Sequence, residues 1–316
     1  MSSVVRGLIT VVMPCFNSAA HVERSVACVL SQTYHDIELL VVDDGSTDNS
    51  LEIVLGIADS RLRAIPQQNE GASAARNRAI SEANGEYIAF LDSDDTWSQD
   101  FLEKMHDALV DRPDAVIAYC GWQNLGVSVG RGRPFVPPDY ECPRKVELLL
   151  ESCPWPIHAC LTRTAAVRAA GGFDVRLQCA EDYALWLTLA SANNIVRVEA
   201  VMAFYHHHSA TQASANRILS AIQGWFVQQE FIREHPALIR DLPDRDLRRL
   251  TDGALLTRGL EAFWARDLGA AHAILRAVAR TGYGSLRDWK YILPTVLPFG
   301  LYRGLVKLID FWKFEQ

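Results

Sequence analysis

The stretch EYIAFLDSDDTW, from Glu86 to Trp97, begins as an apolar run and ends in acid. Its first half, Glu86–Leu91, is typical of a buried strand. The carboxylates of Asp92, Asp94 and Asp95 follow directly. They repel one another unless a cation or a hydrogen-bond donor pairs with them. A divalent cation is the first candidate, because hard ions bind carboxylate oxygens. The stretch therefore predicts a strand that carries an acidic site at its end.

Apolar runs and helical patterns alternate on both sides of this stretch. Strands are predicted at Leu8–Met13, Ile37–Val42, Leu62–Pro66, Glu86–Leu91 and Ala115–Cys120. Helices are predicted from Asn17 or Ser18 to Ser31, from Ser46 or Thr47 to about Ala58, at Ala72–Ala83 and at Ser98–Val110. Strands and helices that alternate at these lengths predict an α/β fold with a parallel sheet and right-handed crossovers.

Polar clusters begin where four of these strands end. The clusters are Pro14–Asn17, Asp43–Asp44, Gln67–Gly71 and Asp92–Asp95. The carboxyl ends of parallel strands share one edge of the sheet, and ligands bind at that edge in open α/β folds. The spacing alone therefore predicts that four segments, far apart in the sequence, converge on one crevice.

The remainder of the chain divides into a mixed segment and a helical one. Residues Gly121–Pro156 contain many Gly, Pro and Arg residues, which predicts a loop or an insertion over the crevice. Next come a short helix ended by Gly171–Gly172, a helix at Ala180–Asn194 and a strand at Ile195–Tyr205. From about Ala213 the pattern is almost wholly helical, so we predict one α/β domain at 1–212 and a helical region at 213–316.

Composition narrows the class of protein. The 316 residues are 49% hydrophobic, which is enough for one large core or for a domain with an appendage. The formal net charge of −7 gives no argument for a nucleic-acid partner. The seven cysteines include no CxxC pair, which argues against a disulfide framework or a zinc site and suits a reducing cytosol. The N-terminus lacks signal-peptide design and no apolar run reaches about 20 residues, so we expect a cytoplasmic protein without a transmembrane span.

Six motifs occur in order along the first two thirds of the chain. They are TVVMPCFN, VVDDGSTD, NEGASAARN, FLDSDDTW, GGFD and EDYALWL. In this order they resemble family 2 glycosyltransferases of the GT-A fold, over about Leu8–Ser214. The resemblance implies a Rossmann-like, mostly parallel sheet flanked by helices, with a helical C-terminal extension. It also implies an inverting enzyme that uses a nucleotide-sugar donor, often a UDP-sugar, with Mn²⁺ or Mg²⁺, and that glycosylates a hydroxyl of a glycan or lipid-linked acceptor.

The tripeptide Asp92-Ser93-Asp94 resembles the DxD motif of this family. The leaving group is a nucleoside diphosphate, and its charge must be neutralised as the bond breaks. The resemblance implies that Asp94 is the metal ligand and that Asp92 serves the ribose or the waters on the metal. For Asp95, the alternative is to cap the helix that follows.

Further donor-side candidates follow from the same resemblance. It implies that Asp44 reads the base, and the alternative is that Asp43 and Asp44 only shape the turn at Gly45. Arg76 is either a neighbour of the phosphates or base, or a surface salt-bridge residue. The complete set of implied donor-binding residues is Pro14, Phe16, Asn17, Asp44, Asn69, Gly71, Arg76, Asp92 and Ser93.

The pair Glu181-Asp182 opens a predicted helix. Inverting transfer needs one base that takes the proton of the acceptor hydroxyl. The resemblance implies that Asp182 is this base and that Glu181 orients it, and the alternative is two acids that stabilise a helix N-terminus. Among His206, His207 and His208, which follow the last predicted strand, His208 matches the family histidine that contacts pyrophosphate or metal. An uncommitted surface cluster is the alternative for these histidines.

Two functions from other classes compete with this one. The run FLDSDDT also satisfies the DxDxT motif of haloacid-dehalogenase-like phosphatases, with Asp92 as nucleophile and Asp94 as acid/base. That fold usually carries the motif on its first strand, whereas three strand–helix units precede it here. A non-catalytic nucleotide-sugar-binding module is the other alternative, and the intact Glu181-Asp182 pair argues against it.

The C-terminal end carries an apolar stripe at helical spacing. Its members are Leu301, Leu305, Leu308, Ile309 and Trp312. Arg303, Lys307 and Asp310 lie on the opposite face, and the helix is too short and too charged to span a bilayer. Two interpretations stay open. The stripe packs on the catalytic domain or on a second subunit of a homodimer, or it binds peripherally at the inner face of the plasma membrane, which suits a lipid-linked acceptor.

Overall fold

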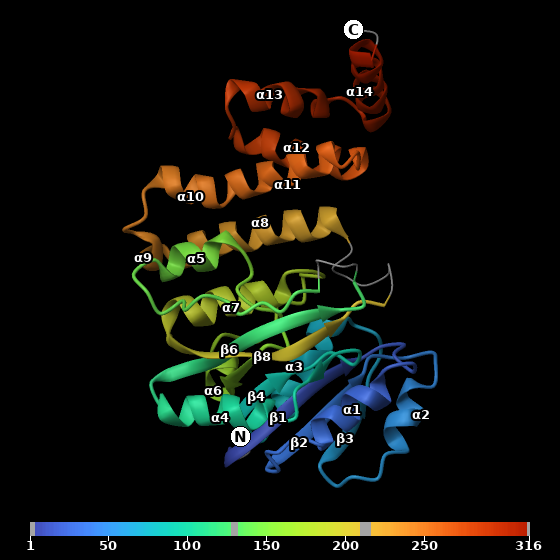
Figure 1. The fold of residues 1–316 in the computed structure, drawn as a ribbon, viewed down its shortest axis with the longest axis vertical. Helices are drawn as coiled ribbons and strands as arrows, with labels where there is room; N and C mark the ends of the chain where they lie inside the picture. Colours follow the sequence, from blue (N-terminus) through green and yellow to red (C-terminus); the bar gives the residue numbers. More distant parts are fainter. Residues whose placement is uncertain (1–3, 128–131, 209–215, 315–316) are drawn as a thin grey trace. The chain divides into compact units, whose positions relative to one another are not determined.

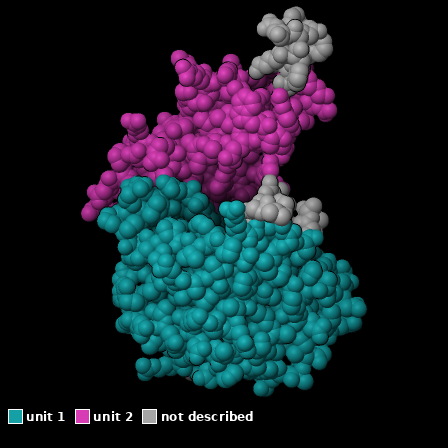
Figure 2. Space-filling view, viewed as in Figure 1, with its two compact units in different colours: residues 1–210 teal, residues 211–316 magenta. Residues whose placement is uncertain are grey.

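The structure is a computed structural model that describes residues 4–127, 132–208 and 216–314, with side chains up to residue 308. Contacts within the chain divide it into two compact units, Met1–Ala210 and Thr211–Gln316, which Figure 2 distinguishes by colour. The first unit contains the sheet and the predicted polar clusters, and the second consists of helices (Figure 1).

The first half of the sheet confirms the predicted parallel strands. In spatial order these are β3 (Leu62–Pro66), β2 (Ile37–Asp43), β1 (Val5–Cys15) and β4 (Gly85–Phe90). The crossover helices are α1 (Val22–Leu30), α2 (Ser50–Leu55) and α3 (Ala72–Glu82) (Figure 1). β1 is buried from Ile9 to Cys15, as its unbroken apolar run predicts. The carboxyl ends of the four strands share one edge, so the four polar clusters begin there.

The second half of the sheet is mixed, so the sheet as a whole is mostly parallel, as the resemblance implied. β6 (Ala115–Leu125) runs parallel to β8 (Asn194–His206). β7 (Cys160–Arg163) lies antiparallel between β4 and β6, and β5 (Thr96–Trp97) pairs antiparallel with β8. β5 and β7 are too short to show a hydrophobic period, so sequence reading missed both.

The segment predicted as irregular, Gly121–Pro156, contains regular structure. β6 extends into the start of this segment and ends at Leu125, and α5 (Lys145–Glu151) lies in the second half of the segment. That prediction was wrong in these two parts. The helices α4 (Phe101–Asp111), α6 (Thr164–Ala169) and α7 (Glu181–Ala192) complete the cover of the sheet.

An aromatic cluster fixes α7 in the core of the first unit. The rings of Tyr119 and Trp155 stack with centroids 4.4 Å apart, and Trp155 lies 6.3 Å from Trp186 of α7. Phe90, at the end of β4, lies 6.3 Å from Trp186 as well. Both tryptophans are fully buried, so the first turn of α7 has a defined position relative to the end of β4.

The second unit is helical, as predicted. Its elements are α8 (Arg217–Glu234), α9 (Pro236–Ile239), α10 (Asp244–Leu250), α11 (Asp252–Trp264), α12 (Leu268–Thr281), α13 (Leu286–Ile292), the 3₁₀ helix η2 (Leu293–Val296) and α14 (Phe299–Phe314). Its own core forms around buried side chains such as Leu255, Ile274 and Leu275. Of the helices in the described ranges, none combines the length and apolar content that crossing a bilayer requires.

Candidate active site

The loops after β1, β2 and β4 are joined by side chains at the carboxyl edge of the sheet. The Oδ1 of Asn17 accepts from the backbone N–H of Thr47 at 2.8 Å. Asn17 has a φ of 50°, a left-handed conformation that asparagine tolerates. The hydroxyl of Ser93 donates to the hydroxyl of Ser18 at 2.7 Å, which joins the acidic loop to the same junction. Asn17 therefore links two loops instead of capping α1, which begins at Val22.

Asp44 organises the loop that follows β3. Its Oδ1 accepts from Gln67 Nε2 at 2.7 Å and from the backbone N–H of Glu70 at 2.9 Å. Its Oδ2 accepts from the backbone N–H of Gly71 at 2.8 Å. Asp43 and Asp44 are both buried. A carboxylate oxygen can accept two hydrogen bonds. Because Oδ2 of Asp44 accepts the one from Gly71, this carboxylate shapes the loop and keeps acceptor capacity.

The other predicted donor-side residues lie around the same edge. Pro14 is paired in register with Val42 of β2, and Phe16 follows it with its ring half exposed. A Cβ on Gly45 would lie 3.0 Å from the backbone nitrogen of Asn69, and Gly45 has a φ of 72°. Only glycine lets these two loops approach so closely without strain.

Arg76 is a buried cation that joins two carboxylates from distant segments. Its Nη2 lies 2.7 Å from Oδ1 of Asp92, and its Nη1 lies 2.9 Å from Oε1 of Glu181. The guanidinium also lies over the ring of Phe173, 5.3 Å from its centroid. Burial alone would lower the pKa of Arg76, but the two carboxylates outweigh it and raise the pKa above its ordinary value. The alternative of a surface salt bridge is therefore wrong, because the side chain is 4% exposed.

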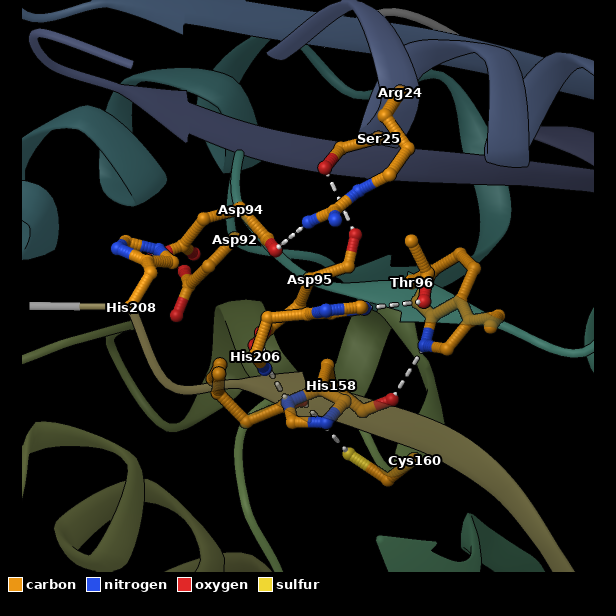
Figure 3. Close-up of polar contacts among 12 residues, drawn as sticks. Arg24, Ser25, Asp92, Asp94, Asp95, Thr96, His158, Cys160, His206 and His208 are labelled. Atoms are coloured by element: carbon orange, nitrogen blue, oxygen red, sulfur yellow. Dashed lines mark hydrogen bonds and ion pairs between the residues drawn. The ribbon is translucent and has the colours of Figure 1, made fainter. Parts of the chain in front are cut away.

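Asp94 lies beside His208 and Arg24 (Figure 3). Its Oδ2 lies 2.7 Å from Nε2 of His208, and the ring of His208 stacks on His21 at 4.1 Å. The Nη2 of Arg24 donates to the backbone carbonyl of Asp94 at 2.6 Å. About a quarter of the Asp94 side chain is exposed, so this carboxylate faces solvent as well as its partners.

Two side chains at this position, Asp94 and His208, are of types that bind divalent cations. A carboxylate oxygen from Asp94 and an imidazole nitrogen from His208 are both ligands that Mn²⁺ accepts, and the carboxylate suits Mg²⁺. Within the described ranges, no group of three or more His, Cys, Asp or Glu residues could hold a metal ion.

Asp95 and His158 form a buried pair behind this site. The Oδ1 of Asp95 accepts from the backbone N–H of His206 at 2.8 Å, while Oδ2 lies 3.3 Å from Nδ1 of His158, at an angle that makes no hydrogen bond. Burial and nearby carboxylates raise the pKa of Asp95 well above its usual range, and burial lowers the pKa of His158 to about 4. Both directions favour an uncharged pair. Asp95 does not cap the next helix, whose N-cap is Asp100.

The three consecutive histidines have three different surroundings. His206 Nε2 lies 3.0 Å from the hydroxyl of Thr96, and the ring of His207 packs against Tyr205 at 4.5 Å. His208 is the one that reaches Asp94 (Figure 3). The histidines therefore do not form one uncommitted cluster.

Asp182 lies at the first turn of α7. Its Oδ1 accepts from the backbone N–H of Tyr183 at 2.7 Å, and Oδ2 lies 3.8 Å from the thiol of Cys153. Burial, followed by the charge of Glu181, raises the pKa of Asp182 to about 7. Ala180, which precedes the pair, has a left-handed φ of 65°, an unfavourable conformation for alanine. A carboxyl group that titrates near neutral pH suits a general base.

Sequence reading missed several residues at this site. Arg24 in α1 contacts Asp94, and His21, which directly precedes α1, contacts His208, in both cases only after folding. Their place after the first polar cluster was the sole signal in the sequence. Cys153 and His158 lie around the end of the segment that was predicted as irregular, and no pattern marks them. Each of these four depends on contacts between distant segments.

Comparison with known proteins agrees with the fold and the motifs. The family described as Glycosyl transferase family 2 matches residues 10–165. The Escherichia coli UDP-Glc:alpha-D-GlcNAc-diphosphoundecaprenol beta-1,3-glucosyltransferase WfgD is 32% identical over 233 residues, which cover 72% of this chain and 88% of that protein. The enzyme WfaP of the same organism, which carries the same activity name, is 30% identical over 218 residues, or 68% of this chain and 83% of that protein.

Solved structures resemble the chain over most of its length. S. aureus TarS 1-349 in complex with UDP-GlcNAc has a TM-score of 0.64 at 20% identity and covers 94% of this chain and 87% of its own. The mannosyltransferase PcManGT from Pyrobaculum calidifontis, in complex with GDP-Man and Mn²⁺, has a TM-score of 0.55 at 20% identity, with 91% and 85% covered. At such identity these two structures establish the fold alone.

Proposed function

Since this chain belongs to glycosyl transferase family 2, we propose that it moves a sugar with inversion from a UDP-sugar to a hydroxyl of a lipid-linked glycan. Membership makes the chain a glycosyltransferase, while the nucleotide, the stereochemistry and the acceptor are the proposal. The printed names of one relative and one structural neighbour support the donor and acceptor classes. WfgD is named for UDP-Glc and a diphosphoundecaprenol-linked GlcNAc, and TarS 1-349 binds UDP-GlcNAc.

The observation that carries the proposal is the bridge through Arg76. One guanidinium contacts Asp92 on the donor side at 2.7 Å and Glu181, the neighbour of Asp182, at 2.9 Å. The two carboxylate segments therefore have a fixed relation although 89 residues separate Asp92 from Glu181 (181 − 92). An inverting transfer needs this relation, because the base and the leaving group act on opposite sides of one anomeric carbon.

Asp182 is the proposed general base. As the acceptor oxygen attacks the anomeric carbon, its O–H proton passes to Oδ2 of Asp182 and a new C–O bond forms. The bond from that carbon to the diphosphate breaks on the opposite face, and its electron pair leaves with UDP. Glu181 stays bonded to Arg76 and holds the first turn of α7 in place. The pKa of about 7 for Asp182 provides a proton acceptor at neutral pH.

A divalent cation, Mn²⁺ or Mg²⁺, would be held by Asp94 and His208. When bound, it would neutralise charge on the diphosphate leaving group. Arg24, exposed beside the carbonyl of Asp94, supplies a second positive charge close to the same position. His21, stacked on His208, keeps that imidazole turned toward Asp94.

The proposed nucleotide site lies on the loops after β1, β2 and β3. The half-exposed ring of Phe16 is suited to stack on a base, and Pro14 precedes it on β1. Asp44 is proposed to accept from the base while it holds Gly71, and Asn69 lies in the same loop. Asn17 and Ser93 support this surface through the bonds that join the loops.

The phosphatase alternative is not favoured. A nucleophilic Asp92 would need a free carboxylate, whereas Asp92 is paired with buried Arg76. The motif also follows β4, which is not the first strand. The non-catalytic alternative loses support because Asp182 combines a raised pKa with a strained preceding residue.

The proposal is tested by incubating the full chain with UDP-Glc, UDP-GlcNAc or GDP-Man, each with Mn²⁺ and a GlcNAc-diphosphate lipid. We expect UDP release that depends on the acceptor and a β-linked product by NMR. An α-linked product would refute inversion and the role of Asp182. Turnover with GDP-Man alone would refute the donor class.

A further inference from the structure

The end of the second unit presents large apolar side chains to solvent. They are Leu286, Leu293, Val296, Phe299, Leu301 and Leu308, and we call this set the C-terminal apolar face. They come from α13, η2 and α14, which follow one another in the chain. Single exposed apolar residues are ordinary, but a dense series of them over 23 residues, from 286 to 308, indicates an interaction surface.

The apolar side chains of α14 are exposed even though the helix is docked. α14 is docked through a different stripe, because Tyr302 and Val306, one turn apart, are 1% and 6% exposed. The ring of His272 from α12 contacts Tyr302 at 5.0 Å and Phe299 at 5.5 Å. The helix therefore already has the contacts that hold it.

The leucines of α14 lie on another face of the same helix. Leu301 and Leu308 are two turns apart and are 63% and 58% exposed. The sequence predicted that these leucines belong to one stripe, and one interpretation was that the stripe packs on the catalytic domain or on a second subunit. In the single chain Leu301 and Leu308 are mostly exposed, Leu305 is partly buried, and the side chains of Ile309 and Trp312 lie outside the described residues.

α13 and η2, like α14, each have one buried face and one exposed apolar face. Leu286, Lys290 and Leu293 share one face at helical spacing, and Leu286 is 95% exposed. In the 3₁₀ turn, Val296 lies above Leu293 because residues three apart eclipse. Ile292 and Thr295, one position earlier in each case, are fully buried. Each element thus has one face toward the core of the unit and one apolar face toward solvent.

Exposed basic residues accompany this face. Arg287, Lys290, Arg303 and Lys307 are all exposed, and residues 282–308 contain only one acidic residue, Asp288. The carboxylate of Asp288 accepts from the backbone N–H and hydroxyl of Ser285 in a capping box. This segment is therefore positive although the whole chain has a formal net charge of −7.

We propose that the C-terminal apolar face binds the surface of an anionic bilayer. The leucines of this face insert at the interface between headgroups and acyl chains, and its lysines and arginines pair with anionic headgroups. Trp264, 58% exposed and 5.5 Å from the ring of Tyr291, adds an aromatic side chain suited to that depth. A second copy of the chain fits less well, because a two-fold contact would bring the same basic residues of both copies together.

This inference rests on the proposed function in one respect, which is the reason for membrane contact. A lipid-linked acceptor is confined to the bilayer, so an enzyme held at that surface meets it more often. Binding itself does not depend on catalysis and can be measured without any sugar.

The test is co-sedimentation of the full chain with vesicles of phosphatidylglycerol and phosphatidylcholine, and with vesicles of phosphatidylcholine alone. We expect binding to the anionic vesicles that weakens at high salt. The double variant Leu301→Gln, Leu308→Gln and the double variant Arg303→Glu, Lys307→Glu should each bind at least about tenfold more weakly. The matched controls Leu55→Gln, 67% exposed in α2, and Arg240→Glu, 76% exposed directly after α9, should bind as the unaltered chain does.

Other outcomes separate this inference from the proposed function. No sedimentation at low salt, with transfer to a short-chain acceptor retained, overturns the membrane inference alone. Vesicle binding without any sugar transfer leaves the inference standing and overturns the proposed function. If the leucine variant instead converts a dimer into a monomer by sedimentation velocity, and vesicles bind neither form, the face is a dimer interface and the inference is wrong.

Discussion

The Nη2 of Arg76 lies 2.7 Å from Oδ1 of Asp92, and the arginine is almost wholly buried. The other terminal nitrogen of the same guanidinium reaches Glu181 at 2.9 Å. A buried charge of this kind is stable only while it is paired. The end of β4, the helix α3 and the first turn of α7 are therefore held as one body, and the candidate site is built around it.

Replacing Arg76 by Met should destabilise the protein. The change leaves Asp92 and Glu181 without their cation, and breaking a buried pair costs about 3–5 kcal/mol. Because 28% of Asp92 remains exposed to water, we expect roughly 2–3 kcal/mol in the free energy of unfolding, measured with urea. Arg78→Met on the same helix, with a side chain 57% exposed, is the control and should stay within about 0.5 kcal/mol. Equal losses in both variants would show that the bridge carries no stability.

Replacing Asp94 by Asn should weaken the metal-dependent binding of UDP. The change removes a negative oxygen ligand from a hard cation, and we expect a Kd for UDP with Mn²⁺ that is roughly 10- to 100-fold higher. Calorimetry with and without Mn²⁺ measures it. Asp107→Asn, 68% exposed on α4, is the control. An affinity and metal dependence that both match the unaltered chain would exclude Asp94 as a ligand.

The parallel half of the sheet could be predicted because its strands are long apolar runs. β3 occupies the predicted range, β2 extends one residue beyond it, and β4 is shifted from its predicted range by one residue at each end. The polar clusters then follow from one rule, that parallel strands end at one edge. In this half of the sheet the local hydrophobic pattern agrees with the tertiary structure, so the sequence predicts both the strands and the shared edge.

The rest of the site depends on contacts that no local pattern encodes. β7 has four residues and is recognised only by its pairing with β4 and β6. Asp95 looks like a helix cap because an acid precedes α4, yet it lies buried against His158 from a segment 63 residues away (158 − 95). Arg76 looks like an ordinary exposed arginine on a polar helix until two carboxylates are folded against it.

Gly85→Ala should destabilise the first unit through backbone contact. A Cβ at this position would lie 2.6 Å from the backbone nitrogen of Thr10 and 2.7 Å from the carbonyl of Leu8, where β4 begins beside β1. Neither atom can move without disturbing the sheet, so we expect a loss of about 1–3 kcal/mol in urea unfolding. Gly56→Ala is the control, because its Cβ would meet atoms no closer than 3.4 Å and its φ is −74°. Similar values for the two variants would contradict this view of the β1–β4 contact.

Asp182→Asn should retain donor binding and lose transfer by roughly 10²-fold or more, the scale of a lost general base. In the unaltered chain, kcat should rise with pH through about 7 as Asp182 loses its proton, and this rise should be absent from the variant. Stopped assays of UDP release between pH 5.5 and 8.5 measure both. Glu181 becomes the next candidate if the variant transfers sugar at a rate close to that of the unaltered chain.

The same residue should make stability depend on pH with an unusual sign. The pKa of Asp182 is raised in the folded state, from 3.8 to about 7, because burial and Glu181 disfavour its charge. The folded protein therefore binds the proton more tightly than the unfolded chain, so this contribution is complete below pH 3.8 and is lost as the pH rises through about 7. Asn carries no charge at any pH. Relative to the unaltered chain, Asp182→Asn should therefore gain on the order of 1 kcal/mol or more between pH 5 and pH 8. Urea unfolding at both pH values measures the difference, and a gap between the two proteins that stays constant with pH would mean that Asp182 ionises in the folded protein as it does in the unfolded chain.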